Sequence, residues 1–267
     1  MLEQLFSLKG KTAWITGGSQ GLGKHMAEVL ASVGANIIIN GRNPSAAQDA
    51  ATDISHRFGV AAFGSSADVA DEPGINRFLA DAKALVGSPD ILICNAGLNF
   101  RLPTVQMPVE RWDEIIRTNL TGPFICSKAA LPAMMQNGFG RVIHVSSILG
   151  MVGLADRPPY TASKGGVIQL MRTQSLETAG TGVTVNALCP GPLGGSCQIR
   201  AVQIEDPSRS LGRDLRTQRG HPLPRIASEQ LHDGIVHHRG WWLDRPVNPR
   251  SAAKPIPQEL TPGRLRG

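Results

Sequence analysis

Short apolar segments alternate with longer amphipathic segments along the first 193 residues of the chain. The apolar segments have the length of buried strands, whereas Leu22, Met26, Val29 and Leu30 show the helical spacing of the segment after the first of them. Strands separated by helices of ten or more residues form βαβ units, in which the strands are parallel and helices cover both faces. The chain is therefore predicted to be an α/β protein with one doubly wound parallel sheet and ligands at the carboxyl ends of its strands. The predicted strands are TAWIT (12–16), NIIIN (36–40), AAFG (61–64), DILICNAG (90–97), RVIHVSS (141–147) and GVTVNALCPG (182–191).

The length of 267 residues and an apolar fraction of 41% suit one globular α/β domain. No run of eighteen apolar residues suggests a membrane span, and the start MLEQLFSLKGK lacks the pattern of a signal or transit peptide. The cysteines Cys94, Cys126, Cys189 and Cys197 include no C-x-x-C pair, which favours reduced, buried thiols over a disulfide framework. We therefore expect a cytoplasmic protein with no membrane partner and no metal.

The net charge of +6 is concentrated in the last part of the chain. After residue 193, twelve Lys and Arg residues stand against seven Asp and Glu residues, so most of the excess positive charge lies there. The preceding residues are nearly neutral and offer no basic surface for phosphates, so no nucleic-acid partner is predicted.

A glycine-rich segment, TGGSQGLG at residues 16–23, directly follows the first predicted strand and opens the next helix. Glycines in such a turn let backbone N–H groups approach a pyrophosphate, and the helix N-terminus adds positive potential. A purely structural turn is the alternative, but the position between a strand and a helix favours a dinucleotide site. The predicted cofactor contacts in this segment are Gly17, Ser19, Gln20, Gly21, Leu22 and Gly23.

The end of the second predicted strand indicates which dinucleotide binds. When the cofactor is NAD, an acidic residue there commonly binds the ribose hydroxyls. This chain has NGRN instead, with Asn40 and Arg42, so no carboxylate repels a 2′-phosphate and a guanidinium is present to bind it. We therefore predict NADP in preference to NAD. The alternative is that Arg42 is simply a solvated loop residue.

The segment YTASK places Tyr160 and Lys164 one helical turn apart on the same face. A phenol is a weak acid near neutral pH unless a neighbouring cation stabilises its phenolate, and Lys164 can supply that cation. Ser147 ends the strand RVIHVSS and reaches the same crevice. Asn119 lies in a long predicted helix, where the Gly-Pro pair at residues 122–123 is expected to disturb the regular hydrogen bonding.

Seven short motifs occur in the order typical of one enzyme family. Together they make the chain resemble the short-chain dehydrogenases/reductases over residues 5–193. The motifs are TGGSQGLG, DV (Asp68, Val69), NAG (residues 95–97), TNL with Asn119, SS (Ser146, Ser147), YTASK and PG (Pro190, Gly191). The resemblance implies a Rossmann-fold catalytic domain at residues 1–193 and an NAD(P)-dependent oxidoreductase that acts on CH–OH groups.

The resemblance also implies a role for each residue of the site. Tyr160 would exchange a proton with the substrate oxygen, and Ser147, rather than Ser146, would donate a hydrogen bond to that oxygen. Lys164 would stabilise the phenolate and bind the nicotinamide ribose. Asn119 would hold the water that links Lys164 to solvent. The other implied cofactor contacts are Asp68 and Val69 at the adenine, Asn95, Ala96 and Gly97 along the ribose, and Pro190 and Gly191.

The substrate is predicted to be a small polar molecule of the sugar-acid type. The segments NAGLNFR, DRPPYTASKGGV and NALCPGP resemble those of gluconate 5-dehydrogenases. Beside Ser147 and Tyr160 at the reacting oxygen, Arg101 and Arg157 flank the expected site and are candidates to pair with a carboxylate. Each of the two is alternatively an ordinary surface arginine. A 3-oxoacyl-carrier-protein reductase is the nearest competing interpretation.

Residues 194–267 depart from the family pattern. The resemblance leads us to expect a threonine after the PG motif, then a helix that covers the substrate and a seventh strand with a V-D-G-G-like turn. Gly195 stands instead at the threonine position, and the segment is rich in Arg, Pro, Gly and His. The C-terminal strand is therefore predicted to be missing or altered, and the segment to be irregular or poorly ordered.

The segment IVHHRGWWLDRP at residues 235–246 suggests a change of reading frame. Its histidines lack the pattern of a zinc site, and its aromatic residues lack a folded platform for nucleic acid. Read one base later, the codons of Trp241, Trp242 and Leu243 encode two consecutive glycines whichever leucine codon is used. Suitable synonymous codons around them give an ending that contains V-D-G-G. We therefore interpret the segment as a frameshift product, which sequencing the source DNA through codons 190–250 would check.

Two functional interpretations of different classes follow from the sequence. The first is an NADP-dependent oxidoreductase that interconverts a secondary alcohol and a ketone by hydride transfer. The second is a catalytically impaired NAD(P)-binding protein with a damaged C-terminus. The intact set of Asn119, Ser147, Tyr160 and Lys164 favours the first, whereas residues 194–267 favour the second. The resemblance implies a homotetramer or homodimer, an assembly that the altered segment puts in doubt.

Overall fold

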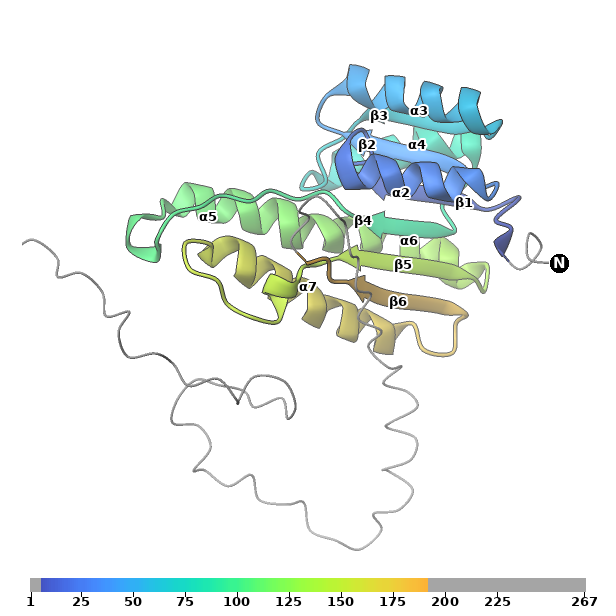
Figure 1. The fold of residues 1–267 in the computed structure, drawn as a ribbon. Coiled ribbons are helices and arrows are strands. Elements are labelled where there is room, and N and C mark those ends of the chain that lie inside the picture. Colours follow the sequence, from blue (N-terminus) through green and yellow to red (C-terminus); the bar gives the residue numbers. More distant parts are fainter. Residues whose placement is uncertain (1–5, 192–267) are drawn as a thin grey trace, which may run out of the picture. The chain divides into compact units, whose positions relative to one another are not determined.

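Parallel strands form one sheet in the computed structural model, which describes residues 6–191 (Figure 1). Within these residues the strand order is β3-β2-β1-β4-β5-β6, so the chain begins in the middle of the sheet, builds to one edge and then crosses back to build to the other. All neighbouring strands run parallel, which confirms the predicted doubly wound sheet. The strands are β1 (Thr12–Thr16), β2 (Asn36–Gly41), β3 (Ala62–Ser66), β4 (Ile91–Cys94), β5 (Gly140–Val145) and β6 (Val183–Leu188).

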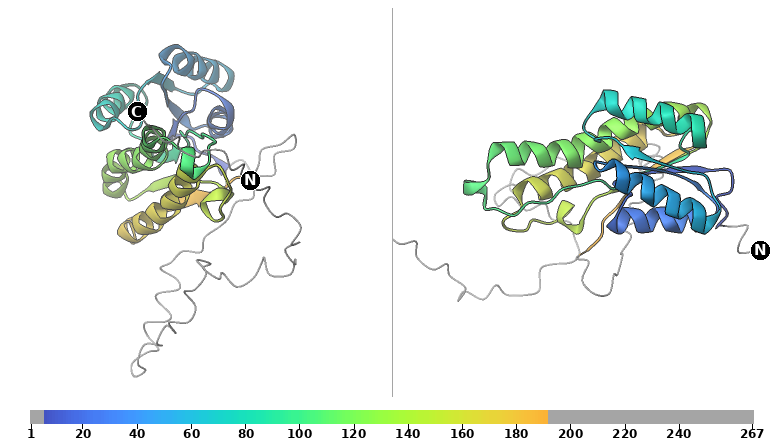
Figure 2. Two further views of the ribbon diagram at one scale, coloured as in Figure 1. Left: turned by 90° about the vertical axis from the view of Figure 1, so that its left-hand side faces the viewer. Right: turned by 90° about the horizontal axis from the view of Figure 1, so that it is seen from above.

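Helices pack on both faces of the sheet (Figures 1 and 2). Trp14 and Leu92 point to the face covered by α4, α6 and α7, whereas their neighbours Ile15 and Ile93 point to the face covered by α2 and α3. This alternation gives each face its own apolar core, as expected for a sheet buried on both sides. The helices are α2 (Gly21–Ser32), α3 (Pro44–Phe58), α4 (Glu72–Val86), α5 (Val109–Ile116), α6 (Gly122–Gln136) and α7 (Pro158–Glu177).

Helix α2 turns a stripe of small residues to the sheet. Gly23, Ala27 and Ala31 are its buried residues, whereas Val29 is 53% exposed. The prediction that Val29 lies on the buried face was therefore wrong. The buried face is displaced by one residue from the predicted one, since each buried residue directly follows a member of the predicted stripe. Small residues on this face allow α2 to lie close to the strands, which brings its N-terminus near the ends of β1 and β4.

The segment between β2 and β3 folds as helix α3, which the apolar periodicity did not predict. Its buried stripe consists of Ala47, Ala50, Ala51 and Ile54, so three of its four members are small. The helix packs closely on β3, because a Cβ atom added at Gly64 would lie 2.1 Å from the carbonyl oxygen of Ala47. Alanine contributes little to an apolar pattern although it forms helices well.

The long helix predicted around Asn119 is present but interrupted. A single π turn, Arg117–Thr121, joins α5 to α6 directly before the Gly-Pro pair at residues 122–123. A Cβ atom added at Gly122 would lie 2.6 Å from Cγ2 of Val69, so glycine is needed for this close approach. The predicted disturbance of the regular hydrogen bonding is therefore confirmed, and it falls on the turn that carries Asn119.

Several expectations concern composition and the end of the chain. Cys94, Cys126 and Cys189 are buried free thiols, as predicted, and Cys197 lies outside the described residues. No helix within residues 6–191 is long and apolar enough to cross a membrane. The predictions made for residues 194–267, including the altered strand, the domain boundary and the reading-frame change, also lie outside the described residues.

Candidate active site

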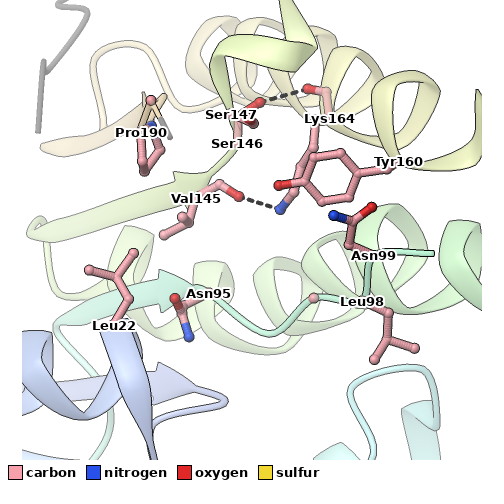
Figure 3. Close-up of a pocket in the computed structure, with 12 residues that line it drawn as sticks. Leu22, Asn95, Leu98, Asn99, Val145, Ser146, Ser147, Tyr160, Lys164 and Pro190 are labelled. Carbon is pink, nitrogen blue, oxygen red and sulfur yellow. Dashed lines mark hydrogen bonds between the residues drawn. The ribbon is translucent and has the colours of Figure 1, made fainter. Parts of the chain in front are cut away.

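A pocket of about 260 Å³ lies at the carboxyl ends of β4, β5 and β6 (Figure 3). Segments that are far apart in the chain meet here, because the ends of parallel strands share one edge of the sheet. The lining residues are Leu22 from α2; Asn95, Gly97, Leu98 and Asn99 after β4; Val145, Ser146 and Ser147 at the end of β5; Tyr160 and Lys164 from α7; and Pro190 and Gly191 after β6. Eight of the sequence-predicted site residues are therefore brought together in one pocket: Leu22, Asn95, Gly97, Ser147, Tyr160, Lys164, Pro190 and Gly191.

Tyr160 and Lys164 enter the pocket from the first two turns of α7 (Figure 3). The Nζ atom of Lys164 lies 5.7 Å from the centroid of the Tyr160 ring and donates a hydrogen bond to the carbonyl oxygen of Val145 at 2.7 Å. Lys164 is only 5% exposed, and this burial lowers the pKa of its ammonium to about 8. The amine is therefore able to hold or release a proton close to neutral pH.

The hydroxyl groups of Ser146 and Ser147 make different hydrogen bonds. Ser146 Oγ donates its proton to the carbonyl oxygen of Lys164 at 2.7 Å, so its hydroxyl is committed to α7. Ser147 Oγ accepts from the backbone N–H of Leu149 at 3.1 Å and donates no hydrogen bond to the described residues. Only Ser147 therefore has a proton free for a substrate oxygen, which supports the choice made between the two serines from the sequence.

Asn119 is fully buried in the π turn and does not line the pocket. Its side-chain oxygen accepts from the backbone N–H of Leu98 at 2.7 Å, and its side-chain nitrogen donates to the Leu98 carbonyl at 2.8 Å. The nitrogen also donates to Oγ of Ser163 at 3.1 Å. Asn119 thus acts on the site indirectly, by fixing the backbone of Leu98 in the loop that follows β4. Its expected hold on a water molecule stays a prediction.

The glycine-rich loop and the start of α2 fit the pyrophosphate of a dinucleotide. Gly17 and Gly21 adopt positive φ angles of 63° and 54°, which glycine tolerates best. A Cβ atom added at Gly23 would lie 2.4 Å from the carbonyl oxygen of Gly17, so the first turn of α2 needs glycine there. Neither a side-chain cap from Gln20 nor an acidic residue occupies this first turn. The N–H groups and the positive end of the helix are therefore available to an anion.

Thr16, at the end of β1, joins this loop to the NAG segment after β4. Its hydroxyl oxygen accepts from the backbone N–H groups of Asn95 and Ala96, both at 3.0 Å. The Asn95 amide in turn donates to the carbonyl oxygens of Thr16 and Gly17, at 3.0 and 3.3 Å. The two loops are thus held side by side, so Asn95 and Leu22 come to line the same pocket.

At the end of β2, the side chain of Asn40 faces the core. It is 1% exposed, its side-chain oxygen accepts from Nε1 of Trp14 at 2.8 Å, and its side-chain nitrogen donates to the carbonyl oxygen of Ala67 at 3.1 Å. The next residue, Gly41, points the other way, since a Cβ atom added there would lie 3.1 Å from Oγ of Ser19. The side chain of Asn40 is therefore already bonded within the core, and its predicted contact with the cofactor stays a prediction. Gly41 and the exposed Arg42 are the residues available at this end.

The DV pair follows β3 at the same edge of the sheet. Asp68 is exposed and its carboxylate accepts from the backbone N–H of Ala70 at 2.9 Å. Val69 is buried against Gly122. Their predicted contact with the adenine stays a prediction, but the Asn40–Ala67 hydrogen bond fixes the backbone directly before them.

Arg101 and Arg157 do not line the pocket. They belong to two segments joined by a hydrogen bond from the Leu102 N–H to the carbonyl oxygen of Asp156 at 2.9 Å, and Arg101 is exposed. The structure therefore gives no support to their role as partners of a substrate carboxylate. Asn99, which the sequence analysis missed, lies beside Tyr160 in the pocket instead (Figure 3). Its place two residues after the NAG motif is the signal that would have identified it.

Comparison with known proteins agrees with this geometry. The family described as short chain dehydrogenase matches residues 11–203. The chain is 40% identical over 184 residues to D-beta-hydroxybutyrate dehydrogenase of Cupriavidus necator, covering 69% of this chain and 71% of the relative. It is 34% identical over 184 residues to a 3-oxoacyl-[acyl-carrier-protein] reductase of Aquifex aeolicus, covering 69% and 74%.

Solved structures show the same likeness. The chain is similar, with a TM-score of 0.68 and 33% identity, to a gluconate 5-dehydrogenase from Burkholderia cenocepacia J2315 in complex with NADP and tartrate. That similarity covers 72% of this chain and 74% of the other. A gluconate dehydrogenase from Agrobacterium tumefaciens is similar with a TM-score of 0.66 and 37% identity, covering 70% and 73%.

Proposed function

The chain belongs to the short-chain dehydrogenase family of oxidoreductases that act on CH–OH groups, and we propose that it is an NADP-dependent enzyme that interconverts a secondary alcohol and a ketone on a small polar substrate. One observation carries the proposal. Ser147, Tyr160 and Lys164 converge in a pocket whose other wall comes from Leu22 at the start of α2 and from Asn95. This convergence supports a proton donor that acts beside a site that fits a dinucleotide.

The side chains divide the proton chemistry between them. In the direction of reduction, Tyr160 gives its hydroxyl proton to the carbonyl oxygen, and the buried ammonium of Lys164 stabilises the phenolate that remains. Ser147 donates its free proton to the same oxygen and stabilises the charge that develops there. The nicotinamide, when bound, supplies or accepts the hydride. In the direction of oxidation, the Tyr160 phenolate accepts the proton of the alcohol.

The preference for NADP is supported by the residues at the end of β2, where the adenosine ribose of the cofactor is expected. Gly41 offers no carboxylate, Ser19 Oγ lies close to it, and the exposed Arg42 follows it in the chain. A guanidinium binds a phosphate well, and the absence of an acid at this place removes repulsion. The structure of the Burkholderia relative contains NADP, which agrees with the preference.

A small substrate with several oxygens suits the pocket best. Among the described lining residues Lys164 is the only charged one, and Asn99, Ser147 and Tyr160 add uncharged hydrogen-bonding groups. Such a lining suits hydroxyl and carboxylate oxygens, and two similar structures are described as gluconate dehydrogenases. The similarity to a 3-oxoacyl-[acyl-carrier-protein] reductase keeps a 3-oxoacyl thioester as the second candidate substrate.

Absorbance at 340 nm tests the proposal directly. The full chain is mixed with NADP⁺ and gluconate, 3-hydroxybutyrate or a 3-hydroxyacyl thioester, and NADPH formation is followed. We expect turnover with gluconate or a related sugar acid, and a rate that falls by a factor of about 10² to 10⁴ in Tyr160→Phe. Turnover with the thioester alone would favour the second candidate. A protein that binds NADPH but turns over none of these substrates in either direction would contradict the proposal.

A further inference from the structure

A buried series of hydrogen bonds joins three segments that build the site. The Asn119 amide binds both the N–H and the carbonyl oxygen of Leu98, in the loop after β4. The same amide donates to Ser163 Oγ at 3.1 Å, and Ser163 Oγ donates to the carbonyl oxygen of Tyr160 at 2.8 Å. Asn119 and Ser163 are both 0% exposed. We call this series, from Leu98 through Asn119 and Ser163 to Tyr160, the clasp.

Ser163 completes the hydrogen bonding of Asn119. An amide nitrogen has two protons, and those of Asn119 go to the Leu98 carbonyl and to Ser163. The hydroxyl proton of Ser163 is committed to Tyr160, so its oxygen presents a lone pair to Asn119. Removing this hydroxyl would leave a buried N–H of Asn119 without a partner, which is costlier than losing a hydrogen bond at the surface. The two hydrogen bonds between the Asn119 side chain and the Leu98 backbone would then weaken.

The position of the loop matters because it forms the pocket wall next to Lys164. Gly97 and Leu98 both line the pocket. A Cβ atom added at Gly97 would lie 3.3 Å from the side-chain oxygen of Asn119 and 3.6 Å from Nζ of Lys164. The loop at Gly97 therefore lies close to both Asn119 and the buried ammonium of Lys164. A shift of Leu98 would change the width of the pocket at Lys164.

We propose that Ser163 is a positioning residue, which holds the pocket wall formed by Gly97 and Leu98 at a fixed distance from Tyr160 and Lys164. Through that wall it sets the affinity for the nicotinamide half of NADPH. The second part of the inference rests on the proposed function. The clasp itself is made of protein groups alone and is measurable without cofactor or substrate.

A matched pair of variants separates the clasp from the stability of α7. Ser163→Ala removes the link to Asn119. Thr161→Val removes a hydroxyl from the same helical turn, but Thr161 Oγ1 donates only to the carbonyl oxygens of Arg157 and Pro158, within the start of α7. Hydrogen exchange of the Leu98 amide is measured in the cofactor-free full chain. We expect exchange about tenfold faster in Ser163→Ala and unchanged in Thr161→Val.

Ligand binding provides the second measurement. Titration with NADPH and with 2′,5′-ADP, which carries only the adenine half, distinguishes a local effect on the pocket wall from a general loss of structure. We expect the Kd for NADPH to rise threefold to tenfold in Ser163→Ala, with the Kd for 2′,5′-ADP unchanged. Thr161→Val is expected to change neither.

Three outcomes would overturn the inference. The first is unchanged Leu98 exchange in Ser163→Ala, and the second is an equal acceleration in Thr161→Val. The third is an equal weakening of NADPH and 2′,5′-ADP binding by Ser163→Ala, which would indicate a purely structural role. A wild-type chain that binds no NADPH would instead contradict the proposed function, and Leu98 exchange would still decide whether the clasp exists.

Discussion

Lys164 shows how burial at a single residue serves chemistry at a cost to stability. Burial lowers the pKa of its ammonium from 10.5 to about 8 in the folded protein. Below pH 8 the folded state therefore carries a buried charge, at a cost of about 3 kcal/mol relative to an exposed lysine. Between pH 8 and 10.5 the unfolded chain binds more protons than the folded protein, so stability rises with pH and the cost disappears.

Replacing this lysine by an apolar residue of similar length should therefore stabilise the inactive protein. In Lys164→Met the free energy of unfolding at pH 7 is expected to rise by about 1–2 kcal/mol, because the lost bond to the Val145 carbonyl offsets part of the gain. The difference from wild type should shrink at pH 10. Urea unfolding at both pH values measures it. A variant less stable than wild type at pH 7 would contradict this account of the buried charge.

Gly41 is the residue at which we expect cofactor preference to be decided. A carboxylate introduced by Gly41→Asp would repel a 2′-phosphate and bind the two ribose hydroxyls. We expect the Kd for NADPH to rise at least tenfold and the Kd for NADH to fall, as measured by fluorescence titration. Arg42→Ala serves as the companion variant, since it should weaken NADPH binding and leave NADH binding unchanged. The same change for both cofactors in either variant would refute this placement of the 2′-phosphate.

At the residue scale, the motifs identify chemistry but not the direction in which a side chain points. Ser147, Tyr160 and Lys164 were found from short motifs, and they do line one pocket. Asn40 was assigned to the cofactor from its place in the chain, yet the register of β2 turns it toward Trp14. Whether a strand residue faces inward depends on its neighbours in the sheet, which a single sequence does not give.

At the scale of elements, helix α3 was not predicted because it packs on the sheet through small residues, which an apolar pattern does not detect. Helix α3 buries mainly alanines, so it has no stripe of large apolar residues. Helix α4, in contrast, buries the large residues Ile75, Phe78 and Val86 at helical spacing, although Leu85 is 69% exposed. Alanine stripes gain their stability from the closeness of the helix to the sheet, which becomes visible only in three dimensions.

Gly64 tests this close packing. Gly64→Ala would place a Cβ atom 2.1 Å from the backbone of α3, so the helix must move away from β3. We expect the free energy of unfolding to fall by about 2–3 kcal/mol. Gly153→Ala is the control, because nothing lies within 4 Å of the added atom there. Equal stability of the two variants in urea unfolding would show that α3 does not depend on the glycine.

The contact between β5 and α7 carries a pH dependence of its own. His144 is fully buried, its Nε2 lies 2.8 Å from Oε1 of Gln174, and its Nδ1 has no partner among the described residues. Burial lowers the pKa of this imidazole from 6.5 to about 4. As the pH falls from 6.5 to 4, His144 binds a proton in the unfolded chain but stays neutral in the folded protein. Stability should therefore fall by about 3 kcal/mol over this range.

His144→Gln, whose side-chain amide nitrogen reaches about the position of Nε2, keeps a donor for Gln174 and removes the titrating group. We expect a smaller loss of stability between pH 7 and pH 4.5 in this variant than in wild type, whatever its stability at pH 7. Urea unfolding at several pH values gives the slope. An unchanged slope would mean that other groups dominate the acid sensitivity.

At the scale of the whole molecule, alternation of strands and helices was sufficient to predict the sheet and the edge where the site lies. Parallel strands must bring their carboxyl ends together, so motifs at these ends could be expected to meet. The substrate could not be predicted in this way, because the motifs identify the groups that carry out the chemistry, whereas lining residues outside them, such as Leu98 and Asn99, form no pattern that indicates a ligand. The interpretation of residues 194–267 as a frameshift product stays a prediction, which the DNA sequence would check.

A thermal melt of the full chain with NADPH, with NADH and without cofactor tests the central claim most directly. A ligand that binds only the folded state at a hundred times its Kd stabilises that state by about 2.7 kcal/mol, which corresponds to roughly 5–10 °C for a chain of this size. We predict a cooperative transition with a midpoint raised by this amount by NADPH and by clearly less at the same concentration of NADH. A melt with no cooperative transition, with no shift, or with equal shifts for both cofactors would contradict the account of an NADP-dependent oxidoreductase.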